Sequence, residues 1–231
     1  MKKKLLFFTN SLYGGGAEKV LQTLLSNLDL EKYDITLYSV NEEILNDKYP
    51  LNITYRYIFK QIATNIFSRL WAKIYNKIKL LVYYNFSPQT FYRLFVCGKY
   101  DTEVAFIEGY STRIVSGSTN NQSKKLAWVH TDLKNNHWTD IAYHSIEEEI
   151  SCYKRFNSII NVSDSVRKCS IELFGDLNHI TLYNPIDDKT ILKLAQQKIC
   201  LDFTTEATIK LISIGRLVNQ KGYDRLLPII K

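Results

Sequence analysis

The sequence has 231 residues, is 45% hydrophobic and carries a net charge of +7, so it is long and apolar enough to bury a core. These values exclude a disordered tail, and no stretch approaches the roughly 20 apolar residues that a membrane-spanning helix needs. The apolar run within the basic opening MKKKLLFFTN is too short for a secretory signal and predicts a buried strand. We therefore expect a cytoplasmic protein.

Short runs of β-branched or aromatic residues alternate with longer amphipathic runs, which is typical of βαβ units and a parallel sheet. Strands are predicted at residues 4–9, 33–40, 52–58, 103–107, 125–129, 158–162 and 179–183. Helices are predicted at residues 17–28, 140–154, 165–173 and 188–197, in addition to one in a basic segment. The expected fold class is α/β, with a Rossmann-like, doubly wound parallel sheet of about seven strands.

The basic segment between residues 48 and 100 holds nine Lys or Arg residues and no Asp or Glu, so the rest of the chain has a net charge of −2. Apolar residues recur every three or four positions there, which predicts an amphipathic helix over residues 60–84. Its Trp71, Tyr75 and Tyr83 are typical of membrane interfaces, so one interpretation is docking on an anionic membrane surface. A sheet-covering helix with a solvated basic face is the equal alternative, and nucleic acid ranks last because no binding module accompanies the charge.

The cysteines stand far apart in the sequence and form no C-x-x-C pair. No histidine lies at the spacing of a zinc site, so the cysteines predict no zinc site. Buried free thiols in a reducing compartment are the expected state. The four residues are Cys97, Cys152, Cys169 and Cys200.

The regular alternation ends near residue 184. A polar stretch at residues 202–207 precedes a strand predicted at 209–214, which leads through Gly215 and a short loop into the first turns of a helix. One strand and one helix cannot bury their apolar faces alone. We therefore expect one domain over residues 1–205 and an incomplete second domain over residues 206–231.

Three consecutive glycines, Gly14 to Gly16, lie between the first predicted strand and the first predicted helix. Glycine lets the backbone approach a ligand, and a helix N-terminus offers free N–H groups and the positive end of its dipole to an anion. A plain tight turn explains the cluster equally well. The motif is not G-x-G-x-x-G, and no acidic residue ends the second strand, which argues against a dinucleotide site.

Other polar residues follow later strands. His130 lies just past a strand, at the edge where open α/β sheets bind ligands, and its imidazole could hydrogen-bond a hydroxyl or shuttle a proton; a structural histidine is the commoner case. Ser163 caps a helix by default, with ligand binding at the same amides as the second interpretation. Arg216 and Lys221 flank a loop, where two cations either hold a diphosphate or are simply solvated.

Five motifs, taken together and in this order, resemble the family 4 retaining glycosyltransferases of the GT-B fold, which build capsule, O-antigen and other surface glycans in bacteria. The resemblance spans nearly the whole chain. The motifs are Gly14-Gly15-Gly16-Ala17-Glu18-Lys19-Val20, Trp128-Val129-His130-Thr131-Asp132, Val162-Ser163 with Arg167, Tyr183-Asn184-Pro185-Ile186-Asp187, and Ile214-Gly215-Arg216-Leu217 with Lys221-Gly222.

This resemblance implies two Rossmann-like domains that face a cleft, with the acceptor bound by the first and the nucleotide sugar mostly by the second. It implies a catalytic His130 beside the reacting sugar, and no metal or other cofactor. The implied donor-binding residues are Gly15, Gly16, Arg216 and Lys221. The implied acceptor-side candidates are Glu18, Asp132, Ser163 and Arg167.

The family's later acidic motif, E-x7-E, would lie beyond residue 231. The expected function is transfer of a hexosyl-type sugar from a nucleotide-sugar donor to a lipid-linked or saccharide acceptor in cell-surface polysaccharide biosynthesis, with little activity from this chain alone. The alternative is a non-catalytic module that binds the acceptor or the membrane. A dehydrogenase or an epimerase is disfavoured because the dinucleotide motif is missing.

Overall fold

The computed structural model describes residues 1–13, 15–45, 49–61, 69–197, 211–215, 217 and 221–230. The chain divides into two compact units, Met1–Asp187 and Asp188–Lys231. Among the described helices, none combines the length and the apolar character needed to cross a bilayer.

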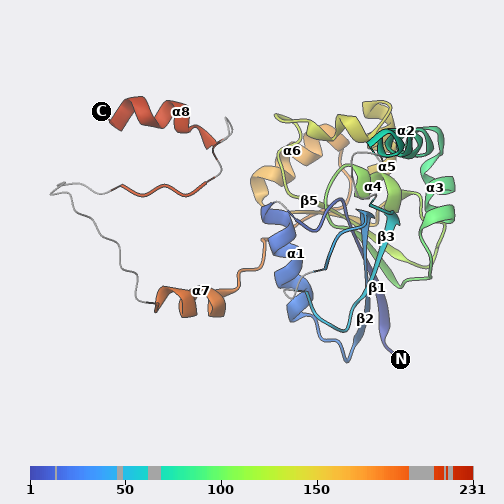
Figure 1. Cartoon of the computed structure of the whole chain (residues 1–231), viewed down its shortest axis with the longest axis horizontal. Helices are drawn as coiled ribbons and strands as arrows, with labels where there is room; N and C mark the ends of the chain where they lie inside the picture. Colours follow the sequence, from blue (N-terminus) through green and yellow to red (C-terminus); the bar gives the residue numbers. More distant parts are fainter. Residues whose placement is uncertain are drawn as a thin grey trace. The chain divides into compact units, whose positions relative to one another are not determined.

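The first unit is built on a sheet of seven parallel strands in the order β3-β2-β1-β4-β5-β6-β7 (Figure 1). The strands are β1 Lys3–Thr9, β2 Tyr33–Asn41, β3 Thr54–Phe59, β4 Thr102–Ala105, β5 Lys124–Val129, β6 Ser158–Asn161 and β7 His179–Thr181. Each lies where the sequence predicts a strand, so the α/β, Rossmann-like, doubly wound fold class is confirmed. The order reverses between β1 and β4, which makes their carboxyl ends the topological switch point where such sheets bind ligands.

The helices of the first unit cover both faces of the sheet (Figure 1). They are α1 Gly16–Asn27, α2 Arg69–Asn85, α3 Pro88–Phe95, α4 Tyr110–Ser116, the 3-10 helix η1 Trp138–Ala142, α5 Ile146–Tyr153 and α6 Asp164–Phe174. Successive strand residues point to opposite faces, so Phe8 packs with Phe91 of α3 on one side and Phe7 packs with Leu21 of α1 on the other. Coverage of both faces explains the nearly continuous apolar run of β1.

Several helices differ from the sequence predictions. The predicted helix at 140–154 is two elements, because the extended Ser145 interrupts it and caps α5 by accepting a hydrogen bond from Glu148 N at 3.3 Å. Helix α4 was not predicted, and neither was α3, although Ser87 caps α3 and Pro88 occupies its first turn. Helix α2 forms the C-terminal part of the basic helix predicted at 60–84 and extends to Asn85; residues 60 and 61 are not helical, and residues 62–68 lie outside the described part of the chain.

The second unit contains α7 Asp188–Ala195, α8 Tyr223–Leu226 and the 3-10 helix η3 Leu227–Ile230. The strand predicted at 209–214 is not formed over its described residues 211–214, and an isolated strand has no neighbour to pair with. Helix α8 follows Gly222, whose φ of +68° favours glycine at this turn. The predicted domain boundary at residue 205 lies outside the described residues.

Three cysteines are free in the described residues, while Cys200 lies outside them. Cys152 is buried and Cys169 is half-buried, but Cys97 is exposed, so the expectation that the cysteines are buried is wrong for that residue. Cys97 follows α3 in a loop, beyond the apolar face that buries that helix.

Candidate functional site

A chain of hydrogen bonds joins the loops that follow β1 and β4 at the switch point of the sheet. The side chain of Asn10 donates from Nδ2 to the backbone oxygen of Glu108 at 2.9 Å. Asn10 Oδ1 accepts from the backbone nitrogen of Ser111 at 2.9 Å and from its hydroxyl at 2.7 Å. Both functional ends of this amide are therefore occupied in fixing the two loops to each other.

Glu108 extends the chain to the loop after β5. Its side chain is fully buried and accepts from His130 N at 3.2 Å and from the Thr131 hydroxyl at 2.6 Å. Trp138 Nε1 in turn donates to Thr131 Oγ1 at 3.0 Å. Burial raises the pKa of Glu108, against the opposing effect of these hydrogen bonds. The sequence predictions missed this residue, although an acid directly after a buried strand is a readable feature.

His130 is half-buried, and its protonation state follows from its contacts. Nε2 lies 2.8 Å from the Phe106 carbonyl oxygen, which can only accept, so Nε2 carries the proton. The ring stacks on Trp128 with centroids 6.1 Å apart. Burial lowers the pKa of His130 to about 4, so the ring is neutral at pH 7 and Nδ1 is left as a hydrogen-bond acceptor. The side chain is suited to orienting a hydroxyl more than to donating a proton.

The glycine turn leads into the N-terminus of α1. Gly15 is the N-cap in extended conformation and provides no side-chain cap, so the first N–H groups of the helix have no cap partner of that kind. A methyl group at Gly16 would meet no atom within 4 Å, whereas one at Gly15 would lie 2.7 Å from Glu18 Oε2. The Glu18 carboxylate thus lies close to the Gly15 backbone, where the helix dipole favours negative charge. Gly14 lies outside the described residues.

The remaining predicted site residues have separate positions. Asp132 accepts from Asn135 N at 3.1 Å and from Asn135 Nδ2 at 2.6 Å, and these bonds lower its pKa. Ser163 accepts from the third residue after it, Val166 N, at 3.2 Å, which is the capping arrangement. Arg167 is exposed on α6, which follows β6, the strand beside β5. These residues surround the carboxyl ends of β5 and β6.

The two predicted diphosphate ligands fall in the second unit. Lys221 is exposed just before α8, and Arg216 lies outside the described residues. Among the described residues, no group of three or more His, Cys, Asp or Glu side chains is arranged to hold a metal ion.

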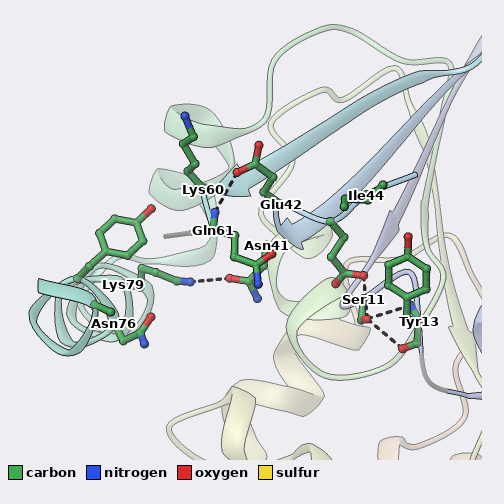
Figure 2. Close-up of a pocket in the computed structure, with 12 residues that line it drawn as sticks. Ser11, Tyr13, Asn41, Glu42, Ile44, Lys60, Gln61, Asn76 and Lys79 are labelled. Carbon is green, nitrogen blue, oxygen red and sulfur yellow. Dashed lines mark hydrogen bonds between the residues drawn. The ribbon is translucent and has the colours of Figure 1, made fainter. Parts of the chain in front are cut away.

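A cleft of about 740 Å³ opens beside the carboxyl ends of β2 and β3 (Figure 2). Its walls come from the loop after β1, the loops after β2 and β3, and α2. A second cavity of about 430 Å³ shares Asn41, Asn76 and Lys79 with the cleft, so the two spaces are neighbours. The sequence predictions placed Lys79 only in the basic helix and assigned none of these three residues to a binding site, because they belong to elements that come together only in the folded sheet.

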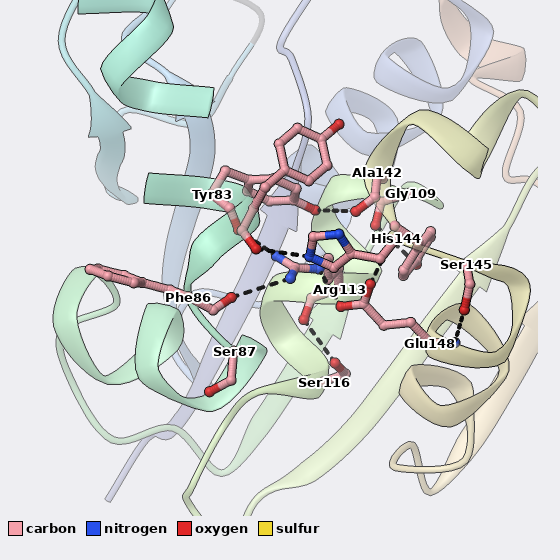
Figure 3. A network of polar contacts seen from close by, with 12 residues as sticks. Tyr83, Phe86, Ser87, Gly109, Arg113, Ser116, Ala142, His144, Ser145 and Glu148 are labelled. Carbon is pink, nitrogen blue, oxygen red and sulfur yellow. Dashed lines mark hydrogen bonds and ion pairs between the residues drawn. The ribbon is translucent and has the colours of Figure 1, made fainter. Parts of the chain in front are cut away.

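Helix α2, which forms one wall of this cleft, is fixed at its C-terminal end by Arg113 (Figure 3). Arg113 is 1% exposed, and its side chain donates to the backbone oxygens of Tyr83 at 2.8 Å and Phe86 at 3.2 Å. Its Nε pairs with Glu148 Oε1 at 2.8 Å, and its guanidinium lies 4.5 Å from the Tyr83 ring. These contacts cap the last carbonyl groups of α2 with a paired cation.

No family model matches the sequence, and no curated protein sequence is significantly similar to it. Solved structures are similar in fold. HepE of Anabaena in complex with UDP and glucose aligns with 84% of this chain and 50% of its own, at 17% identity and a TM-score of 0.51. The HepE complex with UDP aligns with 84% of this chain and 49% of its own, at 16% identity and a TM-score of 0.50. This chain therefore has the Rossmann-like fold of GT-B glycosyltransferases and spans about half the length of those it matches.

Proposed function

We propose that this chain is the acceptor-side part of a glycosyltransferase that uses a nucleotide-sugar donor. The observation that carries the proposal is the hydrogen-bonded chain of Asn10, Glu108 and His130, which fixes three loops at the switch point of the sheet. Open α/β sheets bind their ligands there. The fold supports it too, since it is shared with HepE, a protein solved with UDP and glucose.

In the proposed reaction, each site residue has a separate role. The amides at Gly15 and Gly16, at the N-terminus of α1, bind the donor phosphates. Arg216 and Lys221 hold the diphosphate, so negative charge on the leaving group is stabilised as the glycosidic bond breaks. His130 accepts a hydrogen bond from a sugar hydroxyl at Nδ1 and orients the reacting ring. Glu18, Asp132, Ser163 and Arg167 are the proposed acceptor-side residues.

At a finer level, we propose a family 4 enzyme with retention of configuration, acting in capsule or O-antigen assembly on a lipid-linked or saccharide acceptor. The five sequence motifs support this assignment. Retention in such enzymes is assigned to attack on the same face of the sugar without a protein nucleophile. The proposed location is the cytoplasm, with the chain peripheral on the inner membrane leaflet.

Helix α2 supports the membrane part of the proposal. Trp71, Ile78 and Leu81 recur on one side of the helix and are 69%, 50% and 59% exposed. Helix α2 packs on the sheet through Tyr83, while this stripe stays exposed, and the exposure supports surface docking in addition to covering the sheet. The exposed Lys73 and Lys77 provide attraction to anionic lipid. The same observation supports the second candidate, a module that binds a membrane or acceptor without transferring a sugar.

The two candidates are separated by donor binding. Saturation-transfer NMR with the whole chain and a panel of UDP-, GDP- and dTDP-sugars detects millimolar binding, and release of nucleoside diphosphate reports turnover. Binding of at least one donor that is lost in the Arg216→Ala, Lys221→Ala double variant is the expected result, with Lys193→Ala on α7 as an exposed control. If the folded chain binds no donor in the panel, the glycosyltransferase proposal is contradicted, and the non-catalytic binding module is the remaining candidate.

A further inference from the structure

A short loop connects β1 to the glycine turn, and its backbone is fixed although it belongs to no helix or strand. Thr9 Oγ1 donates to the backbone oxygen of Ser11 at 2.8 Å. The Ser11 hydroxyl donates to the Tyr13 backbone oxygen at 3.0 Å and accepts from Tyr13 N at 3.1 Å (Figure 2). Backbone groups outside regular elements need partners of this kind, so these contacts give residues 11–13 one defined path.

Glu43, in the loop after β2, holds this loop from outside. Its Oε2 accepts from Leu12 N at 2.8 Å and lies 3.2 Å from Ser11 Oγ. A hydrogen bond to an ionised acceptor is roughly twice as strong as one between neutral groups. The carboxylate belongs to a half-buried residue, so water competes with this bond less than it would at the surface.

Leu12 is held at its carbonyl group as well. Its side chain is fully buried and packs in the same apolar cluster as Leu21 of α1. Its backbone oxygen accepts from Tyr49 Oη at 3.4 Å, and burial raises the pKa of Tyr49 to about 12, so the phenol keeps the proton that it donates. Both backbone polar groups of Leu12 therefore have side-chain partners.

Glu43 is itself fixed to the sheet. Its backbone nitrogen donates to Tyr55 Oη at 2.9 Å, and Tyr55 Oη lies 2.7 Å from Ser39 Oγ. Ser39 is fully buried in β2, and Tyr55 lies in β3. Two adjacent strands therefore set the position of the acid that holds the loop after β1.

This loop leads directly into the N-terminus of α1. Two residues separate Leu12 from Gly15, the N-cap, so a displacement of Leu12 moves the first amides of the helix. A carboxylate near a phosphate site repels the ligand by its charge, so Glu43 favours binding there only through the backbone that it holds. Groups that are fixed before binding hold a ligand more tightly, because less order is lost on binding.

We infer that Glu43 is a positioning residue, which holds the loop after β1 so that the Gly15 and Gly16 amides meet the donor phosphates in the orientation that binds them. The inference rests on the proposed function and adds a residue that acts on the donor site through the backbone. The charge of Glu43 and its hydrogen bonds have opposite effects on donor binding, so variants that separate the two can test it.

The first measurement is donor affinity, by saturation-transfer NMR titration with a nucleotide sugar that the parent chain binds. In Glu43→Gln the amide oxygen still accepts from Leu12 N and the charge is gone, so the affinity is expected to stay within about twofold of the parent value or to rise. Glu43→Ala removes the hydrogen bonds and should weaken binding about tenfold. The control Glu42→Ala removes the neighbouring acid, which accepts from Gln61 N at 3.0 Å, and keeps the parental affinity.

The second measurement is hydrogen–deuterium exchange without any donor. The Leu12, Gly15 and Gly16 amides should exchange about tenfold faster in Glu43→Ala, and Glu43→Gln should restore most of the parental protection. A residue that only stabilised the fold would speed exchange throughout the sheet, whereas a positioning residue leaves β5 at its parental rate. Glu43→Asp keeps the charge but shortens the side chain by one methylene, so it should act in the same direction and replaces Glu43→Ala if that variant does not fold.

Donor binding by Glu43→Ala as strong as that of the parent chain, or unchanged exchange at Leu12, overturns the inference and leaves the glycosyltransferase proposal intact. Faster exchange in every strand of the sheet also overturns it, because Glu43 then only stabilises the fold. The proposed function fails separately, when the parent chain binds no donor. The exchange rates of Gly15 and Gly16 in Glu43→Ala then decide alone whether Glu43 holds the turn.

Discussion

The buried carboxylate of Glu108 accepts a hydrogen bond of 2.6 Å from the hydroxyl of Thr131, although the two residues belong to loops that follow different strands. The same carboxylate accepts from the backbone of His130, so one acid positions the loop that carries the proposed catalytic histidine. Loss of either partner leaves a buried polar group unsatisfied, which costs more than the bond itself contributes.

We expect Glu108→Gln to lower the free energy of unfolding by about 1–3 kcal/mol, because the amide can accept only one of the two hydrogen bonds. Thr131→Val should have a similar cost, and the double variant should cost less than the sum of the two. Urea unfolding of the three variants gives the coupling between the residues. Glu147→Gln, on an exposed acid of α5, is the matched control. If the changes in unfolding free energy of the two single variants add up to that of the double variant, the two residues are not coupled and the geometry of this pair is contradicted.

A second prediction concerns pH and His130. Its pKa is lowered by burial to about 4, whereas an unfolded histidine titrates near 6.5. Between these values the unfolded chain binds a proton that the folded chain does not. The stability contributed by this site is therefore fully present above pH 6.5 and is lost as the pH falls toward 4.

His130→Gln keeps a donor for the Phe106 carbonyl and removes the titration. In the parent chain, His130 should lower the free energy of unfolding by up to about 3 kcal/mol as the pH falls from 6.5 to 4, and the variant should lack this decrease. The raised pKa of Glu108 acts in the opposite direction, and comparison of the variant with the parent chain cancels it. Urea titrations at several pH values measure the slopes. An unchanged slope for His130→Gln would be the contrary result.

The turn before α1 allows a test with little effect on the fold. A methyl group at Gly16 meets no atom within 4 Å, and alanine suits the first turn of a helix better than glycine. Gly16→Ala should therefore leave thermal stability equal or slightly higher. If the donor phosphates approach this backbone, the same variant should weaken nucleotide-sugar binding about tenfold, measured by NMR titration. Ala17→Gly, one residue later, serves as the control, and undiminished donor binding by Gly16→Ala would remove the turn from the proposed site.

The sequence predicted the sheet well because each strand is a local run of apolar residues. All seven strands of the first unit lie at predicted positions, and His130 follows β5 as expected. The glycine turn could be predicted for the same reason, because its residues are neighbours in the sequence. Short helices were harder to predict, since seven or eight residues, as in α3 and α4, give too few turns for a clear period.

The contacts that fix the site were not predictable, because they join residues with no local relation. Asn10 and Glu108 are 98 positions apart, and Lys79 and Asn41 are 38 apart. Arg113 reads as an ordinary surface arginine in the sequence, but it is almost fully buried against the end of α2. Pairings of this kind depend on the strand order, which brings β1 and β4 together.

The exposed stripe of α2 makes a prediction about membranes. Leu81 is 59% exposed on α2 and Leu94 is 55% exposed on α3, so Leu81→Ser and Leu94→Ser are matched changes on different helices. Flotation with liposomes containing anionic lipid should recover the parent chain and the Leu94 variant, and lose the Leu81 variant. The reason is that α2 combines its exposed apolar stripe with the exposed Lys73 and Lys77, whereas α3 carries a single basic residue, Arg93.

Charge gives the second half of the membrane test. Each basic residue near an anionic surface contributes about 1 kcal/mol, so changing both Lys73 and Lys77 to Gln should weaken binding about thirtyfold. The attraction is screened by salt, so raising the ionic strength should weaken the parent chain more than this double variant. Two results would contradict membrane docking by α2. One is binding to neutral liposomes as strong as binding to anionic ones, and the other is an equal loss of liposome binding in the Leu81 and Leu94 variants. Either result would leave α2 as a wall of the cleft.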